Sequence, residues 1–367
     1  MKFLRLAFYV LIAQLVLSGC AGEAVEETSS SSSSEINFDA YVGRNASTRS
    51  SITDIKFLQG SVWNAGFGVF ARYGNTHLMD KEHVTWREDH WGYDHIRFWP
   101  SSGTVDFYAF APYSPYVEMG SLPTDLAQKD DISPYTYIRF PSNDSPIDLV
   151  WAKQLGQTAP TSPDSKVTFK FEHALARLSF DITAPKLEDG TVIKVQRVRL
   201  YGVSDFKGVF VMQGYLNLNT GAWILADNGV KWHYSWTPEG KKADIPNNDN
   251  DKKDSIVYKL SDPPELPNLE NKVTNDGDSY IFIIPQTKTE AFHLAITYTV
   301  QQGKFKETVT VKKNLLEVLR PGVPNPSFTF EKGKAYVFHL ILSLDPVDFS
   351  VTVDGKKRDE VTGEITI

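Results

Sequence analysis

Apolar and polar residues alternate along much of the chain with a period of two, which is the pattern of strands that bury one face. The stretch Val167–Ile182 shows it most clearly, but with a change of phase in the middle. Odd positions are apolar in its first half and even positions in its second half. The apolar positions are Val167, Phe169, Phe171 and Leu175, followed by Leu178, Phe180 and Ile182.

This change of phase has two explanations. A bulge near Ala174–Ala176 can absorb one residue of a single long strand, or the strand can pass from one hydrophobic core to a second. We take the second interpretation and predict that two β-domains meet here. The expected division is an N-terminal domain at residues 36–165 and a C-terminal domain at residues 166–367.

Runs of strand length, bounded by turn residues, fill most of the remaining chain. The first run, Ile36–Val42, alternates cleanly, and helical periodicity is scarce apart from one turn expected at Leu315–Leu319. We expect a hairpin to join the tryptophan-rich run His83–Trp99 to the buried run Val105–Ala111. Many short strands with a turn every 8 to 12 residues or so predict an all-β protein built from β-sandwiches. Further runs lie at Ser61–Tyr73, Ile147–Ala152, Val192–Val203, Lys207–Leu218, Tyr280–Ile284, Phe292–Val300, Phe305–Val311, Ala335–Leu344 and Val347–Val353.

The N-terminus carries a targeting pattern. Lys2 and Arg5 precede the apolar run Leu6–Leu17, which is shorter than the ~20 residues of a membrane-spanning helix, so we expect a secretory signal at residues 1–19. The signal ends in Leu-Ser-Gly before Cys20, which is similar to a bacterial lipobox. Cys20 is the only cysteine, so no internal disulfide can form and Cys20 is the expected lipidation site. The lipid would anchor the protein to a membrane.

Residues 20–35 are polar and low in complexity, with six consecutive serines at Ser29–Ser34, and we expect them to be a flexible tether. Loss of Lys2 and Arg5 with the signal would move the formal net charge from -7 to -9. An acidic chain argues against nucleic acid or an anionic bilayer as the main partner.

A search for catalytic and metal-binding motifs finds none of the nucleophile-elbow, phosphate-loop, dinucleotide or zinc-protease signatures. Four histidines lie near acidic residues, but their unequal spacing favours solvated polar residues over a metal site. A pair of carboxylates for glycoside hydrolysis stays open, because the separation of such a pair is not visible in sequence. We therefore expect no enzyme activity, no cofactor and no metal. The histidines are His77, His83, His90 and His95.

Aromatic residues make up 13 % of the chain, and exposed ones could stack on sugar rings. The best candidate platform is the cluster of Trp86, Trp91, Tyr93 and Trp99. Aromatic residues are also common in strands and cores, so packing in the core is the favoured interpretation.

Strand addition suits this chain better, because an unpaired sheet edge accepts a complementary strand from another molecule. The C-terminus offers a donor in two parts, separated by the charged turn Asp354–Glu360. On pattern alone, an ordinary C-terminal hairpin is the favoured alternative. The candidate donor residues are Phe349, Val351 and Val353, then Val361, Ile365 and Ile367.

In addition, the chain resembles the fimbrillin family of Bacteroidetes, in particular the minor-fimbrillin-like lipoproteins, across nearly its whole length after the signal. The resemblance rests on six pieces that occur in the family order. They are Leu17–Cys20; Phe98–Pro100 followed by Val105–Pro112; Asp148–Ala152; Phe171–Leu178; Ile283–Gln286 leading into Leu294–Val300; and Gly333–Leu340 with Val347–Val353.

The resemblance implies two transthyretin-like β-sandwich domains in tandem, in a pilus subunit or adhesin of the cell surface that is exported as an outer-membrane lipoprotein. Its partners would be other fimbrial subunits, in a homo- or hetero-polymer. In polymerising members an arginine-specific protease removes the first strand, and a C-terminal strand of the next subunit fills the opening. Carried over to this chain, Arg44 or Arg49 is the cleavage site, Ile36–Val42 the removed strand and Phe349–Ile367 the donor.

One departure from the family leaves the position in a fibre open. Members often carry a tryptophan after the last long strand, where this chain has Val353-Asp-Gly-Lys. A polymerising stalk subunit, a tip or anchor subunit, and a surface protein that has lost assembly altogether are all compatible with the sequence. An alternative from another class is a glycan-binding lipoprotein of a polysaccharide-uptake system, acting through Trp86, Trp91 and Trp99.

Overall fold

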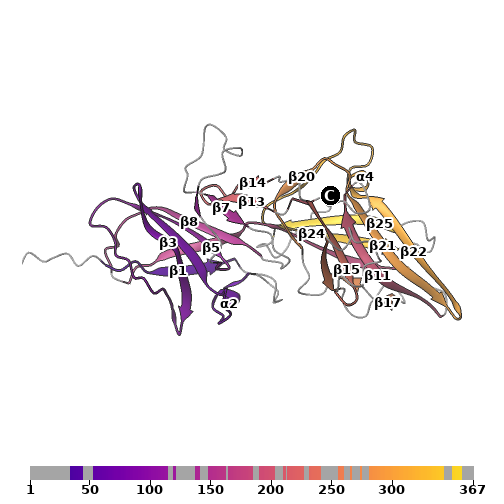
Figure 1. The fold of residues 1–367 in the computed structure, drawn as a ribbon, viewed down its shortest axis with the longest axis horizontal. Coiled ribbons are helices and arrows are strands. Elements are labelled where there is room, and N and C mark those ends of the chain that lie inside the picture. The colour runs from indigo at the N-terminus through magenta and orange to yellow at the C-terminus, as the bar shows by residue number, and fades with distance from the viewer. Residues whose placement is uncertain are drawn as a thin grey trace, which may run out of the picture.

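The protein is described by a computed structural model in which β-strands dominate and the overall shape is elongated, with one sheet-rich body at each end (Figure 1). Among the described residues, two short helices accompany the strands, α2 (Ile55–Leu58) and α4 (Leu315–Leu319). No helix in the described ranges is both long and apolar enough to cross a membrane. The structure describes residues 34–43, 53–114, 119–120, 137–140, 148–162, 164–184, 190–202, 210–211, 213–226, 231–240, 255–259, 265–266, 273–274, 281–342 and 349–357.

The N-terminal body is built on a seven-stranded sheet. In spatial order its strands are β1 (Phe38–Val42), β9 (Val167–His173), β8 (Val150–Gln157), β5 (Val105–Ala111), β2 (Phe67–Tyr73), β3 (Thr76–Arg87) and β4 (His90–Gly92). Strand β1 pairs with β9 in parallel, whereas all other neighbours in this sheet are antiparallel.

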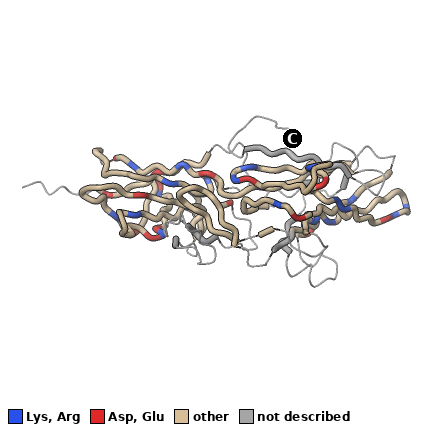
Figure 2. The backbone as a smooth tube through the Cα atoms, turned by 90° about the horizontal axis from the view of Figure 1, so that it is seen from above, with Lys and Arg blue, Asp and Glu red and all other residues tan. Residues whose placement is uncertain are grey.

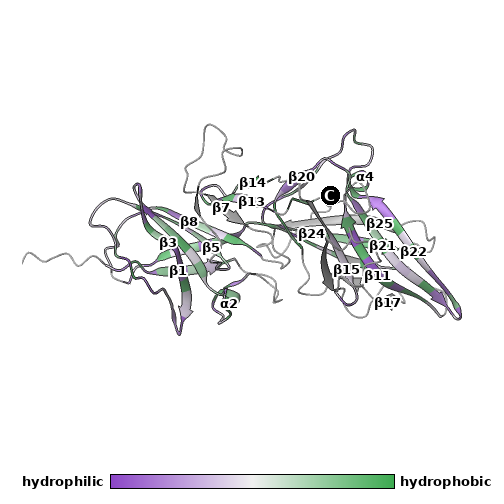
Figure 3. Cartoon of the chain, viewed as in Figure 1, coloured by the Kyte–Doolittle hydropathy of each residue, from purple (hydrophilic) through white to green (hydrophobic). Residues whose placement is uncertain are grey.

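The two faces of this sheet differ in burial from strand to strand. Burial alternates strictly along β9, as its sequence predicts, with every odd residue from Val167 to His173 buried. In β5 nearly all residues are buried, because one face packs in the core beside β1 and the other packs against a second cluster that contains Tyr108 and Phe110. Hydrophobic segments accordingly mark the strands of this body in Figure 3.

The C-terminal body is formed by two sheets that share one core, which holds residues of β10, β11, β21 and β24. A hairpin of two long strands, β21 and β22, projects at the far end of the molecule (Figure 1). One sheet has the order β12 (Phe210–Val211), β15 (Lys231–Thr237), β11 (Thr191–Tyr201), β21 (His293–Gln302), β22 (Phe305–Asn314), with β16 (Ser255–Lys259) beside β15 and β17 (Glu265–Leu266) beside β11. The other has the order β18 (Val273–Thr274), β10 (Ala176–Thr183), β24 (Lys334–Leu342), β25 (Phe349–Lys357), with β19 (Ile281–Ile283) beside β10.

A third cluster of buried residues connects the two bodies. It joins side chains of β2, β5 and β8 to Leu216 of β13, and to Ala174 and Leu175 where the chain passes from β9 to β10. Trp223 of β14 donates a hydrogen bond of 2.7 Å from its indole N–H to the Ala174 carbonyl oxygen. The small sheet here has the order β14 (Trp223–Leu225), β13 (Gly214–Asn217), β7 (Tyr137–Phe140), β6 (Met119–Gly120), and the pair β20 (Gln286–Lys288) and β23 (Phe328–Phe330) completes the strands.

The all-β prediction is confirmed, and so is the change of core in the stretch Val167–Ile182. Strand β9 packs in the N-terminal core and β10 in the C-terminal core, so the phase change marks a passage between cores. The expected boundary at 165/166 does not follow the sheets, because β9 pairs with β8 and with β1. The expected hairpin between His83–Trp99 and β5 is also wrong, since β5 pairs with β2 and β8.

Acidic and basic residues are interspersed along both bodies in Figure 2. The single helical turn expected at Leu315–Leu319 is confirmed as α4. The side chain of Asn314 begins that turn by accepting a hydrogen bond from the Leu316 N–H. Helix α2 begins in the same way at Asp54, whose carboxylate accepts from the Phe57 N–H at 2.8 Å.

Candidate functional site

The first strand, β1, lies at an edge of the N-terminal sheet. Its register with β9 runs from Phe38 opposite Val167 to Val42 opposite Phe171. The Val167 N–H begins the pairing by donating a hydrogen bond of 2.8 Å to the Asn37 carbonyl oxygen. Because β1 is at the edge, its departure would break its pairing with β9 and no pairing between the remaining strands.

A second element holds the start of β1 from the opposite side. Residues 93–99, which we call the clamp segment, pair with residues 34–36 in an antiparallel bridge between Glu35 and Phe98. The Ile36 N–H donates to the Arg97 carbonyl oxygen at 2.8 Å, and the Trp99 N–H donates to the Ser34 carbonyl oxygen at 3.0 Å. The backbone of residues 34–42 is therefore bonded on one side near its start and on the other side along β1.

The side chains of β1 alternate between the core and solvent. Ile36, Phe38 and Val42 are 0 %, 1 % and 4 % exposed, whereas Tyr41 is 49 % exposed. Burying one large aliphatic or aromatic side chain contributes about 2 kcal/mol, so the three together contribute roughly 6 kcal/mol. The backbone of β1 thus pairs with only one strand of the sheet, whereas its buried side chains belong to the hydrophobic core.

Phe38 is the centre of this packing. Its ring lies 5.5 to 6.4 Å, centroid to centroid, from four other aromatic rings contributed by four different segments. We define the acceptor site as the remainder of the core cluster to which Ile36, Phe38 and Val42 belong. Its aromatic members are Phe67, Trp91, Tyr93, Trp99, Phe107, Phe169 and Phe171.

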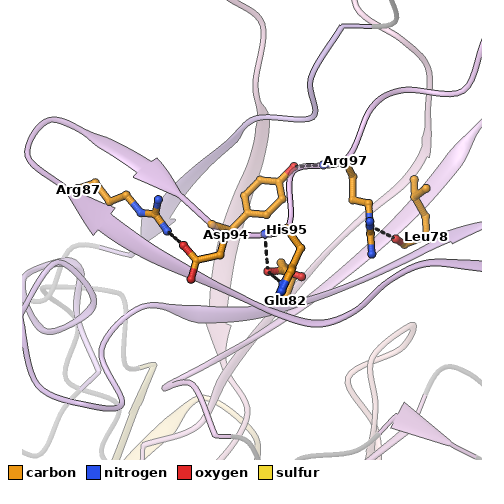
Figure 4. A network of polar contacts seen from close by, with 7 residues as sticks. Leu78, Glu82, Arg87, Asp94, His95 and Arg97 are labelled. Carbon is orange, nitrogen blue, oxygen red and sulfur yellow. Dashed lines mark hydrogen bonds and ion pairs between the residues drawn. The ribbon is translucent and has the colours of Figure 1, made fainter.

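Polar contacts fix the clamp segment on β3 (Figure 4). Asp94 accepts a hydrogen bond of 2.6 Å from Arg87, and His95 lies 3.0 Å from Glu82. The Arg97 guanidinium donates to the Leu78 carbonyl oxygen at 3.0 Å. Each exposed ion pair contributes at most about 1 kcal/mol, so their main effect is to set the position of the segment.

Tyr93 connects the clamp segment directly to β1. Its hydroxyl donates a hydrogen bond of 2.8 Å to the Ile36 carbonyl oxygen and accepts one of 3.2 Å from the Arg97 N–H. Burial raises the pKa of the Tyr93 hydroxyl above its ordinary value, and the hydrogen bond from the Arg97 N–H acts in the opposite direction. At neutral pH the hydroxyl is therefore protonated and able to donate.

A buried polar cluster anchors the chain at Thr53, just before helix α2. The Asp148 carboxylate accepts a hydrogen bond of 3.2 Å from the Thr53 N–H and lies 3.2 Å from His173 Nδ1. The Thr53 hydroxyl donates to the Asp148 carbonyl oxygen at 2.6 Å. Arg44 and Arg49 lie outside the described residues, between β1 and this anchor.

The first part of the candidate donor is strand β25, which pairs antiparallel with β24. Phe349, Val351 and Val353 stand opposite Leu342, Leu340 and Phe338, three buried residues of β24. Strand β25 continues to Lys357, so the charged turn expected to begin at Asp354 is wrong, and the hairpin that the structure describes is the one between β24 and β25. Val361, Ile365 and Ile367 lie outside the described residues, as does Cys20.

The tryptophan platform is wrong for two of its three members. Trp91 and Trp99 are only 4 % and 5 % exposed, because they pack edge-on against Phe67 and Phe107. Trp86 is partly buried against Trp91. Among the described residues, the most exposed large hydrophobic side chain is instead Trp63, at 72 %, in the loop after α2, where no periodic pattern marks it.

The histidines serve structural contacts. His83 stacks on Tyr113 with centroids 3.6 Å apart, and its Nε2 lies 2.8 Å from the Ala65 carbonyl oxygen. His90 Nδ1 lies 2.9 Å from the Asp89 carboxylate, and His95 Nδ1 lies 3.0 Å from the Glu82 carboxylate. In the part of the chain that the structure describes, no group of three or more metal-ligating side chains converges.

Sequence reasoning missed the roles of Tyr93, Asp148 and His173. A signal was present for two of them, because Asp148 and His173 belong to two of the six pieces that carry the fimbrillin resemblance. The structure brings these two pieces together in one buried pair. No signal pointed to the contact between Tyr93 and Ile36.

A comparison with protein families finds that the family described as fimbrillin-like matches residues 48–355. Among curated proteins, the fimbrium subunit Fim1C of Phocaeicola vulgatus is 30 % identical over 206 residues. The match covers 51 % of this chain, and the chain spans 53 %, about half, of that relative.

Among solved structures, a fimbrial protein from Bacteroides vulgatus superposes with a TM-score of 0.57. The superposition covers 89 % of this chain and 99 % of that chain at 19 % identity. At so low an identity the likeness establishes the fold alone, and it agrees with the all-β architecture described above.

Proposed function

Because this chain belongs to the fimbrillin-like family, we propose that it is a subunit of a cell-surface fimbrium, joined to its neighbours by strand exchange. A cut after Arg44 or Arg49 releases β1, and a C-terminal strand of another subunit fills the acceptor site. The observation that carries this proposal is the position of β1, a sheet edge with a buried face.

Two features of the site support exchange over simple loss. Removal of β1 would lose the roughly 6 kcal/mol contributed by burial of Ile36, Phe38 and Val42 and would expose the apolar acceptor site, which favours binding of a replacement strand. An edge site also supplies free backbone groups that a new strand can bond, as in other cases of strand addition.

The anchor at Thr53 explains how the body survives the cut. After cleavage at Arg44 or Arg49, the new N-terminus would still be tied to the core a few residues later through Asp148. The cut then frees β1 alone and leaves helix α2 and β2 in place.

The same proposal includes export and partners. A lipid on Cys20 would tether the precursor to the outer membrane, and the partners are other fimbrial subunits, of the same or of a different kind. The role is structural and adhesive rather than catalytic. Replacement of Cys20 by alanine is expected to abolish labelling of the protein by radioactive palmitate in the producing cell.

The test of strand exchange uses the chain from residue 21 onward with an arginine-specific protease. Mass spectrometry gives the new N-terminus, and an unboiled denaturing gel shows whether stable multimers form. One cut after Arg44 or Arg49 followed by a ladder of multimers is the expected result. Arg44→Lys and Arg49→Lys keep the charge and identify the site, because only one of them should block the cut. A cut protein that remains monomeric would contradict self-polymerisation.

A further inference from the structure

Two strands of this chain that lie in different bodies carry the same side-chain pattern. Strand β1 reads Phe-Asp-Ala-Tyr-Val at Phe38–Val42, and β25 begins with Phe-Ser-Val-Thr-Val at Phe349–Val353. In sequence the likeness extends two residues further back, where Ile36-Asn corresponds to Val347-Asp.

The likeness is greatest at the positions that the acceptor site buries. Phe349 corresponds to Phe38, whose ring packs among four aromatic rings, and Val353 corresponds to Val42. Valine replaces the smaller Ala40, a position that is only partly buried and so has room for a larger side chain. The two exposed positions of β1 hold Asp39 and Tyr41. Ser350 and Thr352 stand at the corresponding positions of β25.

The clamp segment also fits this register. In the bridge between Glu35 and Phe98, the hydrogen bonds are made by residues 34 and 36, so the N–H of residue 35 takes no part in it. In the aligned sequence, residue 35 corresponds to Pro346, which has no N–H to donate. Position 36 corresponds to Val347, which can donate to the Arg97 carbonyl oxygen as Ile36 does.

Strand β25 can leave its own sheet without dividing it. It is the last strand of the order that ends in β24 and β25, and β24 keeps its parallel partner β10 on the other side. The hydrogen bonds that β25 makes with β24 would be exchanged for bonds with β9 and the clamp segment of another copy.

The last residues of the chain fit less well. If Val361 takes the place of Ile36, Gly363 falls at the Phe38 position and leaves the largest part of the acceptor site empty. If Ile365 takes the Phe38 position, Gly363 falls at that of Ile36. An empty space of this size is costly, because the surrounding residues relax only partially.

We infer that the acceptor site of one subunit binds β25 of a second copy, with Phe349 in the place of Phe38 and the strand running parallel to β9. This inference rests on the proposed function and specifies its donor and register. It makes the Phe38 position the main determinant of which strand is accepted.

The first experiment uses the cleaved chain and synthetic peptides that compete with β1. A peptide of residues 345–355 is compared with its Phe349→Ala and Ser350→Ala variants, with a peptide of residues 358–367, and with a peptide of residues 34–43 as a reference. Release of the cleaved N-terminal fragment is followed by size-exclusion chromatography and mass spectrometry. We expect the 345–355 peptide to displace the fragment, the Phe349→Ala peptide to be about 100-fold weaker, and the Ser350→Ala peptide to change by about twofold at most.

A second experiment tests the register between whole subunits rather than with peptides. Because Tyr41 stands opposite Lys170, the inference places Thr352 opposite Lys170 of the neighbouring copy. Mixed subunits carrying Thr352→Cys and Lys170→Cys are therefore expected to form a disulfide between copies after cleavage. The pair Thr366→Cys and Lys170→Cys is the control and should not crosslink.

The outcomes separate the inference from the function on which it rests. If the 34–43 peptide exchanges but the 345–355 peptide does not, the inference is overturned and strand exchange stands. The same holds if the 358–367 peptide takes the site or if the Thr366→Cys subunit crosslinks to the Lys170→Cys subunit. If neither the reference peptide nor any other peptide enters the cleaved protein, both are overturned.

Discussion

The hydroxyl of Tyr93 donates a hydrogen bond of 2.8 Å to the carbonyl oxygen of Ile36, across 57 residues of chain. The contact joins the clamp segment to the strand that the acceptor site holds. Since β9 bonds only the later part of that strand, Tyr93 and the bridge at Glu35 control its first residues. Retention of β1 after cleavage therefore depends on contacts with both β9 and the clamp segment.

Replacement of Tyr93 by phenylalanine removes this hydrogen bond and keeps the ring. A hydrogen bond of this kind contributes about 0.5 to 1.5 kcal/mol, so we expect the cleaved fragment to dissociate roughly 2- to 13-fold faster. The dissociation rate of the fragment is measured by following its replacement by an excess of a labelled 34–43 peptide over time. Tyr73→Phe, on the same sheet at a more exposed position, serves as the control and should leave the rate unchanged.

The same hydroxyl predicts a dependence on alkaline pH. Burial raises the pKa of Tyr93 above 10.0, and once β1 has left, the exposed hydroxyl would return toward that value. Between the two pKa values the open form releases a proton that the closed form keeps, so retention of β1 is full below about pH 10 and falls as the pH rises.

We therefore expect the dissociation rate of the cleaved fragment to be flat up to about pH 9 and to increase above pH 10. Burial also raises the pKa of Tyr108, Tyr113 and Tyr336, so the wild-type protein alone is not diagnostic. The difference between wild type and Tyr93→Phe isolates Tyr93. An equal alkaline increase in both proteins would contradict the assignment.

Replacement of Phe38 by alanine tests the packing of β1 in the uncut chain. A buried phenylalanine replaced by alanine costs about 3 to 5 kcal/mol, because a cavity remains where the ring was. We expect a loss of that order for the N-terminal body in urea denaturation. Tyr41→Ala removes a ring of similar size from the exposed face of the same strand and should cost less than about 1 kcal/mol. Equal losses would show that β1 is not held by its buried face.

Sequence patterning predicted best where a strand buries one face. The alternation in β9 matches its burial residue by residue, and the phase change after His173 correctly predicted a second core. In β5 the continuous apolar run revealed burial but not the neighbours, because a strand buried on both faces has no alternating pattern to orient it. The wrongly expected hairpin follows from that loss of information.

The candidate site was predictable in part for a similar reason. The alternation of Ile36–Val42 predicted β1, and the resemblance supplied its role. Composition could not separate the buried Trp91 and Trp99 from the exposed Trp63, since tryptophan suits both environments. Contacts such as that between Asp148 and His173 join residues far apart in sequence, and spacing carries no information about them.

The connection between the two bodies provides the last prediction. Gly221, in the turn between β13 and β14, has φ of +70°, and a Cβ atom there would overlap the Trp151 ring of β8 and the Lys332 ammonium group. The ammonium group lies 4.9 Å from the centre of that ring, so three segments meet at one point. A glycine is required here both by the backbone angle and by the close approach.

Gly221→Ala is therefore expected to reduce the free energy of unfolding by about 2 to 4 kcal/mol, because the added methyl group causes backbone strain and overpacking. The midpoint of thermal unfolding should fall by several degrees. Gly190→Ala is the matched control, because Gly190 has φ of +81° but nothing within 4 Å of the added methyl group. It carries the backbone strain without the overlap. The difference between the two variants measures how tightly β8, the β13–β14 turn and Lys332 are packed, and equal shifts would mean that this contact does not hold the two bodies together.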